Sequence, residues 1–293
     1  MAVIRWWLVA VGCCFGWPGS SDAASCTQFF AGGRPPVLLF GGMFHDGVVL
    51  CNDDYAVQVS PLTKGPLWSA EDLTEENVQI ARQTARLNDF RADDRLTASQ
   101  QAGLLDYRDA GFDRGHMTPS GDEPGSAAQS QSFLLSNIVP QTAELNRGAW
   151  EGVESAVRGW AEQEGELFIV TGPGYNPDHL PVTIGPGHIP VPDVTWKAVY
   201  DPSGPGTGAY VCTNTTAPHC KITSVALLTA LVGIDPFPAL SPSLKATVFS
   251  MPPIRQSPVA MVHRSGRHKL LKEWGTRTAQ KALKSLLRAL VPR

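Results

Sequence analysis

The sequence predicts a soluble domain of mixed α and β structure with short connections, and three features support this. Short strand-like apolar segments alternate along the chain with a long helical pattern. The 28 glycines and 24 prolines punctuate these segments, yet 43% of the 293 residues are hydrophobic and can fill a core. No apolar run reaches the roughly 18 residues that cross a bilayer, so we do not expect an integral membrane protein.

Four segments carry this prediction in detail. Residues 55–59 alternate apolar and polar side chains, as a half-buried strand does. Residues 144–164 contain few helix breakers and space their apolar side chains at helical intervals. Residues 167–171 are continuously apolar and stop at Gly-Pro-Gly, which is typical of a central strand, and residues 195–200 form another strand.

The N-terminus has the order of a secretory signal. Met1–Arg5 carries one positive side chain, residues 6–17 are apolar, and small residues follow up to Ser25. A buried N-terminal helix and a lipid anchor on Cys26 are the alternatives. We therefore predict a signal peptide at 1–25, a main domain at 26–250 and a basic, partly helical extension at 251–293. The protein is expected to be secreted or periplasmic.

Cysteine usage agrees with export. Four cysteines remain after such a signal, and an even number in an exported chain predicts two disulfides. Cys212 and Cys220 are close enough to close a small loop, so the favoured pairing joins these two and joins Cys26 to Cys51. The two other pairings stay open. A zinc site is the remaining alternative, although the chain lacks a Cys-x-x-Cys motif or a His/Cys cluster.

Charge is divided unevenly along the chain. The net charge is −3, but residues 241–293 hold 11 Lys and Arg against one acid, Glu273, which leaves −13 on residues 1–240. The basic tail is therefore expected to fold back on the acidic body or to meet an anionic partner. Leucines at helical spacing in residues 283–290 predict a basic amphipathic helix, which could lie on the domain, on nucleic acid or on an anionic membrane.

The most compressed set of reactive side chains is Asp113-Arg114-Gly115-His116. Histidine, with an ordinary pKa of about 6.5, is the usual general base at neutral pH. A structural histidine is the alternative interpretation of this segment.

A second polar set follows on the predicted helix. Asn146, Trp150, Glu154 and Arg158 are spaced by four residues, so we expect them on one helix face. An amide oxygen with a nearby carboxylate suits Mg²⁺, which prefers oxygen ligands and keeps most of its waters. The alternative is a surface ladder with an ordinary Glu154–Arg158 ion pair.

Together these residues resemble the DNA/RNA non-specific endonuclease family. The likeness includes the family's Asp-Arg-Gly-His motif and extends, more weakly, over about residues 50–240. It implies an α+β fold with a mixed, largely antiparallel sheet, flanking helices and a ββα-metal (His-Me finger) catalytic core. The ordered residues that follow the motif are Phe133, Asn137, Pro140, Gln141, Asn146, Trp150 and Glu154.

The resemblance also implies roles for single residues. His116 would be the general base that activates a water molecule. Asn146 would be the direct protein ligand of Mg²⁺, or of Mn²⁺ in its place, and Glu154 would orient metal-bound waters. The remaining catalytic and substrate-binding positions are Asp113, Arg114, Arg147 and one upstream arginine, Arg91 or Arg86.

The expected function is that of an exported Mg²⁺-dependent endonuclease that hydrolyses phosphodiester bonds of DNA and RNA without strong sequence specificity. Two alternatives are a non-catalytic secreted nucleic-acid-binding protein on the same scaffold and a phosphodiesterase or phosphatase for small substrates. DNA and RNA are the expected partners, while a homodimer and an inhibitor protein are left open. The basic tail is expected to add salt-dependent affinity for nucleic acid.

Overall fold

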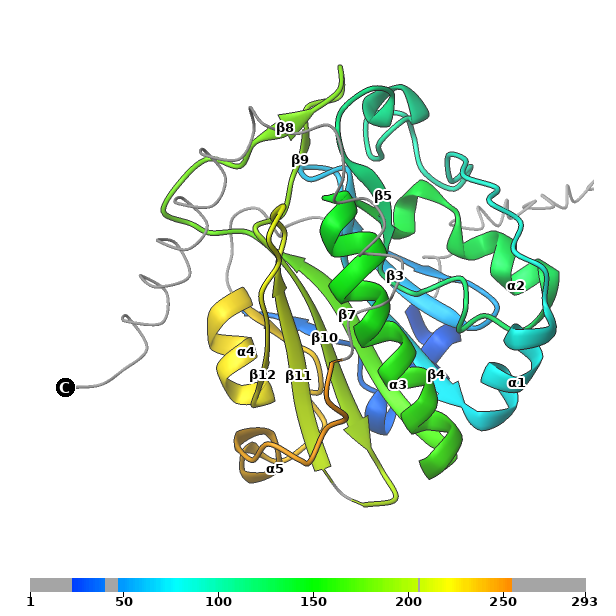
Figure 1. Ribbon diagram of the computed structural model, residues 1–293, viewed down its shortest axis with the longest axis vertical. Helices are drawn as coiled ribbons and strands as arrows, with labels where there is room; N and C mark the ends of the chain where they lie inside the picture. The colour runs from blue at the N-terminus through cyan, green and yellow to red at the C-terminus, as the bar shows by residue number, and fades with distance from the viewer. Residues whose placement is uncertain (1–22, 40–46, 205, 255–293) are drawn as a thin grey trace, which may run out of the picture.

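The computed structural model describes residues 23–39, 47–204 and 206–254 (Figure 1). Most of the expected signal peptide and nearly all of the basic extension lie outside the described residues, so both stay predictions. At the centre is a seven-stranded sheet in the order β12-β11-β10-β7-β4-β3-β2. Every neighbouring pair in this sheet is antiparallel, and helices flank it. The predicted α+β fold is confirmed.

The sheet is built from strands of four to ten residues. They are β2 (Val48–Cys51), β3 (Tyr55–Ser60), β4 (Gly65–Thr74), β7 (Glu166–Gly174), β10 (Val194–Asp201), β11 (Gly206–Thr213) and β12 (Cys220–Thr223). Three further ladders have two strands each: β1 (Val37–Leu38) with β13 (Ile234–Asp235), β5 (Asp113–His116) with β6 (Ile138–Gln141), and β8 (Thr183–Ile184) with β9 (Ile189–Pro190).

Five α-helices and several short turns complete the described chain. The helices are α1 (Glu75–Gln83), α2 (Gly125–Ser132), α3 (Glu151–Glu164), α4 (Val225–Val232) and α5 (Pro242–Ala246). The 3-10 turns are Ala23–Phe29, Ala31–Gly33, Leu104–Tyr107 and Leu135–Asn137, and a π-helical turn covers Leu145–Trp150. Among the described residues, none of these helices has the length and apolar character needed to span a bilayer.

Two apolar layers hold the sheet between its helices. On one face, α3 and α1 pack Val157, Trp160 and Val78 against the sheet. On the other face, α4 and the N-terminal turns contribute Leu228 and Phe29 to a separate cluster. The sheet is thus covered on both sides, with α3 lying across the side that faces the viewer (Figure 1). This explains why its central strands are apolar on both faces.

The predicted strands at 55–59, 167–171 and 195–200 are confirmed as β3, β7 and β10. The expected end of the second strand at Gly-Pro-Gly is wrong, because β7 continues through Gly174. A Cβ atom at Gly172 would lie 2.5 Å from the Trp196 ring, so the glycine admits the neighbouring indole. Trp196 Nε1 in turn donates to the Pro173 carbonyl at 3.0 Å.

The helix predicted at 144–164 is present, but its first part is a π-helical turn rather than regular α-helix. Trp150 is fully buried in the core, whereas Asn146 is partly exposed, so these two residues of the predicted face differ in burial. π-Turns of this kind are frequent at functional sites.

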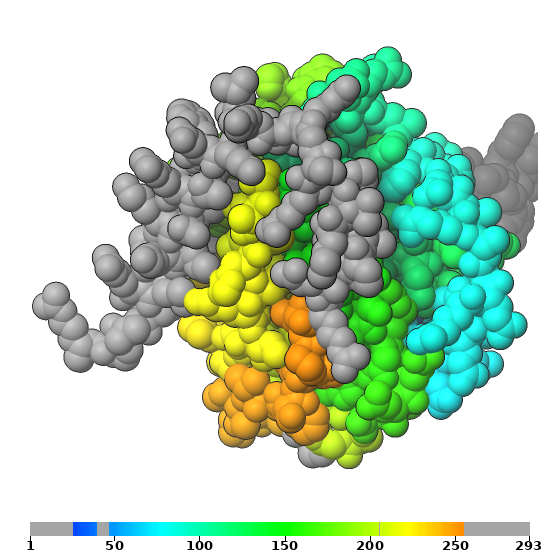
Figure 2. Space-filling view, viewed as in Figure 1, coloured from blue at the N-terminus to red at the C-terminus, as the bar shows by residue number. Residues whose placement is uncertain are grey.

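Both favoured disulfides, Cys26–Cys51 and Cys212–Cys220, are confirmed, which removes the zinc alternative for these cysteines. The chain after α5 remains packed on the domain as far as it is described. Phe249 stacks on Trp160 with ring centroids 5.8 Å apart, and Tyr210 Oη donates to the Pro252 carbonyl at 2.7 Å. In Figure 2 this segment, in orange, lies beside α3 in green.

Candidate active site

The β5–β6 hairpin carries the Asp-Arg-Gly-His motif. In its register, Arg114 lies opposite Pro140, Gly115 opposite Val139 and His116 opposite Ile138. A Cβ atom at Gly115 would lie 2.2 Å from Oε1 of Gln141. The glycine is therefore required by close approach of a side chain, since the fully buried Gln141 fills that space and donates to Thr195 Oγ1 at 3.0 Å.

Asn137 fixes the chain on both sides of this hairpin. Its Oδ1 accepts the Thr118 N–H at 3.0 Å, and its Nδ2 donates to the carbonyls of Thr118 and Ser132 at 2.8 and 2.9 Å. The side chain is fully buried, so all three bonds are protected from water. The backbone that follows His116 is therefore held rigidly.

His116 lies between two phenylalanine rings. Its ring centroid is 4.9 Å from that of Phe133 and 5.3 Å from that of Phe90. Only 7% of the residue is exposed, and its Nε2 atom has no hydrogen-bond partner. A buried ring nitrogen without a hydrogen-bond partner is unusual in a histidine that serves only the structure, because unpaired polar atoms are costly to bury.

Burial, with the guanidinium groups of Arg86 and Arg114 nearby, lowers the pKa of His116 from 6.5 to about 3. The imidazole is therefore neutral at physiological pH and can accept a proton.

The two arginines stack on the rings that enclose the histidine. The Arg114 Cζ atom is 4.2 Å from the Phe90 ring centroid, and the Arg86 Cζ atom is 5.1 Å from that of Phe133. Both residues are exposed, so their guanidinium groups can meet a phosphate in solvent. The hairpin thus combines a neutral base with two fixed positive charges.

Of the two upstream arginines considered from the sequence, the structure brings Arg86 to this cluster and not Arg91. Arg91 Nη1 donates to the Asp89 carboxylate and to the Ser130 carbonyl, both at 2.8 Å. Arg86 Nη1 instead donates to Ser120 Oγ at 2.5 Å, four residues after His116. These contacts favour Arg86 over Arg91 as the upstream arginine of the candidate site.

Asp113 connects the hairpin to the π-helical turn. Its carboxylate accepts from Asn146 Nδ2 at 3.1 Å and from Arg147 Nε and Nη2 at 2.7 and 2.5 Å. The pair with Arg147 is bidentate, a geometry that fixes both side chains. Asp113 thereby orients the Asn146 amide, and Arg147, although half exposed, is engaged with Asp113.

Arg158 on α3 pairs with Asp122 from the turn after the hairpin, and not with Glu154 as the surface-ladder alternative required. The Nη1 to Oδ1 distance is 2.7 Å, and the Asp122 side chain is only 1% exposed. Burial raises the pKa of Glu154 from 4.5 to about 7, against the lowering effect of Arg158 and Lys197. Glu154 is thus part of an enclosed charge network on this side.

Further buried carboxyl groups extend this network. Glu71 on β4 is 3% exposed and lies 3.6 Å from Nζ of Lys197 on β10, which is fully buried. Lys197 also donates to Thr171 Oγ1 at 2.8 Å. Burial raises the pKa of Glu71, and it raises the pKa of Glu123 well above 4.5. One carboxyl oxygen each of Glu71, Asp122 and Glu123 has no hydrogen-bond partner.

The donor set at Asn146 fits a hydrated hard cation. Because Nδ2 donates to Asp113, the amide Oδ1 is left on the opposite edge as an oxygen ligand. In the part of the chain that the structure describes, no group of three or more His, Cys, Asp or Glu side chains could hold a metal ion. The Asn146 amide offers one oxygen ligand, which is compatible with a hydrated hard cation.

The sequence interpretation missed several of these residues. Lys197 is the one charged residue within the apolar segment 195–200, and such an isolated charge in a buried strand is a usable signal, whereas Glu71 lies beside a second acid, Asp72. Phe90 and Asp122 became significant only through contacts with segments distant in sequence. A groove of about 770 Å³ between α3 and residues 249–253 contains none of the candidate site residues.

With this geometry established, comparison with known proteins identifies the class. The model of the DNA/RNA non-specific endonuclease family matches residues 42–243. The chain belongs to this family, whose members are metal-dependent nucleases.

Several relatives are similar over part of their length. Mitochondrial endonuclease G of Homo sapiens is 32% identical over 160 residues, covering 50% of this chain and 52% of that protein. Mitochondrial nuclease 1 of Schizosaccharomyces pombe is 34% identical over 155 residues, covering 52% and 46%. The chain thus spans about half the length of these relatives. Nuclease C1 of Cunninghamella echinulata is 27% identical over 184 residues, covering 59% and 73%.

A solved structure shares the fold. It is a chain from the crystal structure of the EndoG/EndoGI complex, titled for the mechanism of EndoG inhibition. The TM-score is 0.65 with 24% identity, covering 78% of this chain and 97% of that chain.

Proposed function

We propose that this chain is an exported, metal-dependent endonuclease that hydrolyses phosphodiester bonds in DNA and RNA without strong sequence specificity. The observation that carries the proposal is the unpartnered, buried Nε2 of His116 beside two exposed arginines. Family membership supports a nuclease reaction at this site. Within the described residues, the two disulfides fit an oxidising compartment, which supports export.

The proposed chemistry assigns one task to each side chain. Neutral His116 takes a proton from a water molecule, whose oxygen then attacks phosphorus while the bond to the 3′ oxygen breaks, and the leaving 3′ oxygen takes a proton from solvent to become a hydroxyl. Arg114 and Arg86 neutralise the phosphate charge that increases during attack. Asn146, oriented by Asp113, would hold Mg²⁺ or Mn²⁺ and Glu154 would orient its bound waters, and the cation would supply further charge stabilisation at phosphorus.

The test is cleavage of supercoiled plasmid and of total RNA by the purified chain, with Mg²⁺, with Mn²⁺ and with EDTA. We expect both substrates to be degraded to smears and EDTA to abolish the activity. No cleavage with any divalent ion, while DNA is still retarded on a gel, would favour a non-catalytic nucleic-acid-binding protein. Cleavage of a small phosphodiester alone would favour the small-substrate alternative.

The basic tail is proposed to add sequence-independent affinity to an acidic body. Residues 255–293 carry ten Lys and Arg against one acid, so their removal should weaken DNA binding and flatten its salt dependence. An unchanged salt slope after deletion of these residues would contradict this role.

A further inference from the structure

A buried asparagine outside the family motif connects three segments around the candidate site. Asn214 is 8% exposed and follows β11 directly. Its Nδ2 donates to the carbonyls of Pro140 and Pro192 at 2.9 and 3.0 Å, and its Oδ1 accepts the Thr142 N–H at 2.8 Å. Each acceptor and donor of the amide is therefore used on backbone groups from other parts of the chain.

Two of these backbone groups belong to the site. Pro140 is the residue on β6 that lies opposite Arg114 in the hairpin register. Thr142 starts the helical segment, since its carbonyl accepts the Asn146 N–H at 2.9 Å and its Oγ1 accepts the Leu145 N–H at 3.3 Å. Asn214 thus bonds to both ends of the short connection between β6, which pairs with the Arg114 strand β5, and the Asn146 turn.

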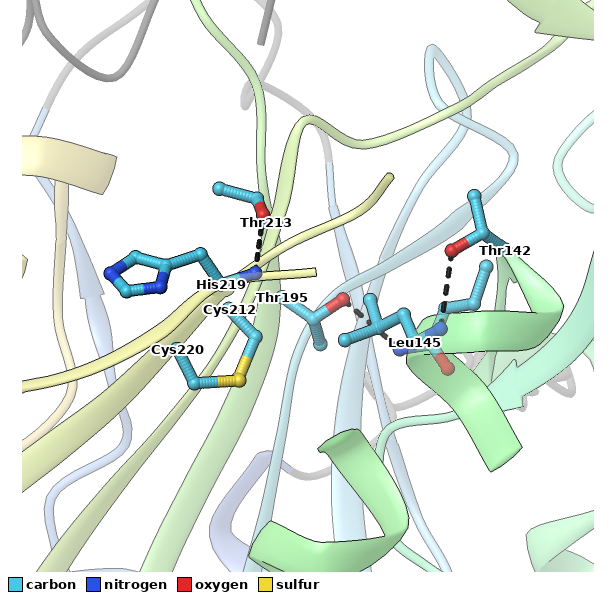
Figure 3. Close-up of a disulfide and its surroundings, with 8 residues drawn as sticks. Thr142, Leu145, Thr195, Cys212, Thr213, His219 and Cys220 are labelled. Carbon is cyan, nitrogen blue, oxygen red and sulfur yellow. Dashed lines mark hydrogen bonds between the residues drawn. A yellow bond between two sulfur atoms is a disulfide. The ribbon is translucent and has the colours of Figure 1, made fainter. Parts of the chain in front are cut away.

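The loop that carries Asn214 is itself closed and anchored. Cys212 and Cys220 face each other in the β11–β12 register and form a disulfide at the base of the loop. The Thr213 N–H donates to the His219 carbonyl at 3.0 Å, and the His219 N–H donates to Thr213 Oγ1 at 2.9 Å. Figure 3 shows the disulfide together with the hydrogen bond from the His219 N–H to Thr213 Oγ1 and the hydrogen bond from the Leu145 N–H to Thr142 Oγ1.

A second contact runs from this loop to the start of the helical segment. Thr142 Oγ1 donates to the Thr215 carbonyl at 2.9 Å. The loop therefore binds Thr142 twice, at its N–H through Asn214 and at its hydroxyl through Thr215.

We infer that Asn214 is a positioning residue, which holds the Asn146 turn and the Arg114 strand in one fixed relation through the disulfide-closed loop 212–220. This inference rests on the proposed nuclease function. The three hydrogen bonds of the amide are buried, so removal of the side chain takes the partner from three buried backbone groups at once. A displacement of about 1 Å at a reacting group can lower a rate by about a hundredfold.

The test compares Asn214→Ala with Asn176→Ala in the full chain. Asn176 is equally buried, at 5% exposure, but its side-chain oxygen accepts only from the Asp178 N–H in its own turn. Hydrogen exchange of residues 142–150 is measured without metal, and plasmid cleavage is measured with Mg²⁺. In Asn214→Ala we expect exchange of these amides to accelerate by about tenfold or more. We expect kcat to fall about tenfold to a hundredfold with KM little changed.

The outcomes separate this inference from the proposed function. Unchanged exchange at residues 142–150, or a kcat equal to that of Asn176→Ala, would overturn the positioning role. If the wild-type chain cuts no nucleic acid, the proposed function fails, while the exchange measurement still decides whether Asn214 holds the Asn146 turn.

Should Asn214→Ala not fold, Thr142→Val provides a milder variant. It removes the hydroxyl bonds to Thr215 and Leu145 but keeps the backbone groups and the side-chain volume. A smaller change of the same two measurements is expected, and no change in either would overturn the inference.

Discussion

The two halves of the candidate site respond to burial in opposite ways. On the hairpin half, formed by β5, β6 and the rings of Phe90 and Phe133, burial and two arginines both lower the pKa of His116. On the carboxylate half, formed by β4, α3 and the turn at 121–123, burial raises the pKa of Glu154 while Arg158 and Lys197 lower it. On the hairpin half the cations shift the pKa in the same direction as burial, and on the carboxylate half they shift it in the opposite direction.

This difference assigns the cations different tasks. The arginines of the hairpin half are exposed, and the imidazole beside them stays neutral with or without them. The cations of the carboxylate half, Arg158 and Lys197, pair with the buried carboxylates of Asp122 and Glu71. Loss of a cation should therefore change chemistry on the hairpin half and stability on the carboxylate half.

The largest expected effect on stability is that of Arg158→Met. The substitution leaves Asp122 buried without its ion pair, and breaking a buried pair in this way costs about 3–5 kcal/mol. Arg82→Met is the matched control, because the Arg82–Glu162 pair is exposed and worth under about 1 kcal/mol. Urea unfolding measures both. Equal losses in the two variants would remove the distinction between enclosed and exposed cations.

Gly115→Ala tests whether close packing in the hairpin half is needed for stability and cleavage, without changing any charge. The added methyl group would meet the buried Gln141 side chain, so we expect a loss of about 1–3 kcal/mol from overpacking. The shifted strand should also lower cleavage by about a hundredfold. Gly159→Ala is the control, because open space surrounds that helical position and alanine should stabilise it by about 0.5–1 kcal/mol. Partial rescue by Gln141→Ala in the same chain would confirm the cause.

Replacing either upstream arginine, Arg86 or Arg91, should have a smaller effect, which is measured as a change in the pKa of His116. Arg86→Met should raise the pKa of His116, because the Arg86 charge lowers it, whereas Arg91→Met should leave it unchanged. Burial remains the largest cause, so the pKa in Arg86→Met should stay below 6.5. Titration of the histidine ring by NMR measures both variants. A rise in Arg91→Met alone would reverse the assignment.

The smallest expected effect concerns a carboxyl on the same strand as Glu71 but outside the site. Burial, with Glu166 nearby, raises the pKa of Asp72 from 3.8 to about 7. The folded chain therefore holds more protons than the unfolded chain between these values, and stability falls as pH rises through them. Asp72→Asn cannot ionise, so its stability advantage over wild type should grow from pH 4 to pH 7. An advantage independent of pH in thermal unfolding would contradict this.

Much of the fold could be predicted because its signals are local. The strands at 55–59 and 195–200 follow from apolar patterning, and the disulfide between Cys212 and Cys220 follows from their short separation. The end of β7 was not predictable, because Gly172 admits a ring from a strand that pairs with it, 24 residues further along the chain. Local turn signals say nothing about such an approach.

The candidate site was predictable to a similar extent. His116, Arg114 and Asn146 follow from the family resemblance, and the structure joins their segments through the Asp113–Asn146 hydrogen bond. Arg86 could not be separated from Arg91, because only the fold shows which of them stacks on Phe133. The role of Asn214 was equally hidden, since its three partners come from Pro140, Thr142 and Pro192.

The most direct test of the account is plasmid cleavage by His116→Ala beside His179→Ala under Mg²⁺. His179 is a partly exposed histidine paired with Asp193 and is absent from the proposed chemistry. Loss of a general base lowers a rate by about 10²–10⁴-fold, and we expect that loss for His116→Ala with DNA binding retained. We expect wild-type rates for His179→Ala. Full activity in His116→Ala would contradict the assignment of the buried imidazole as the base.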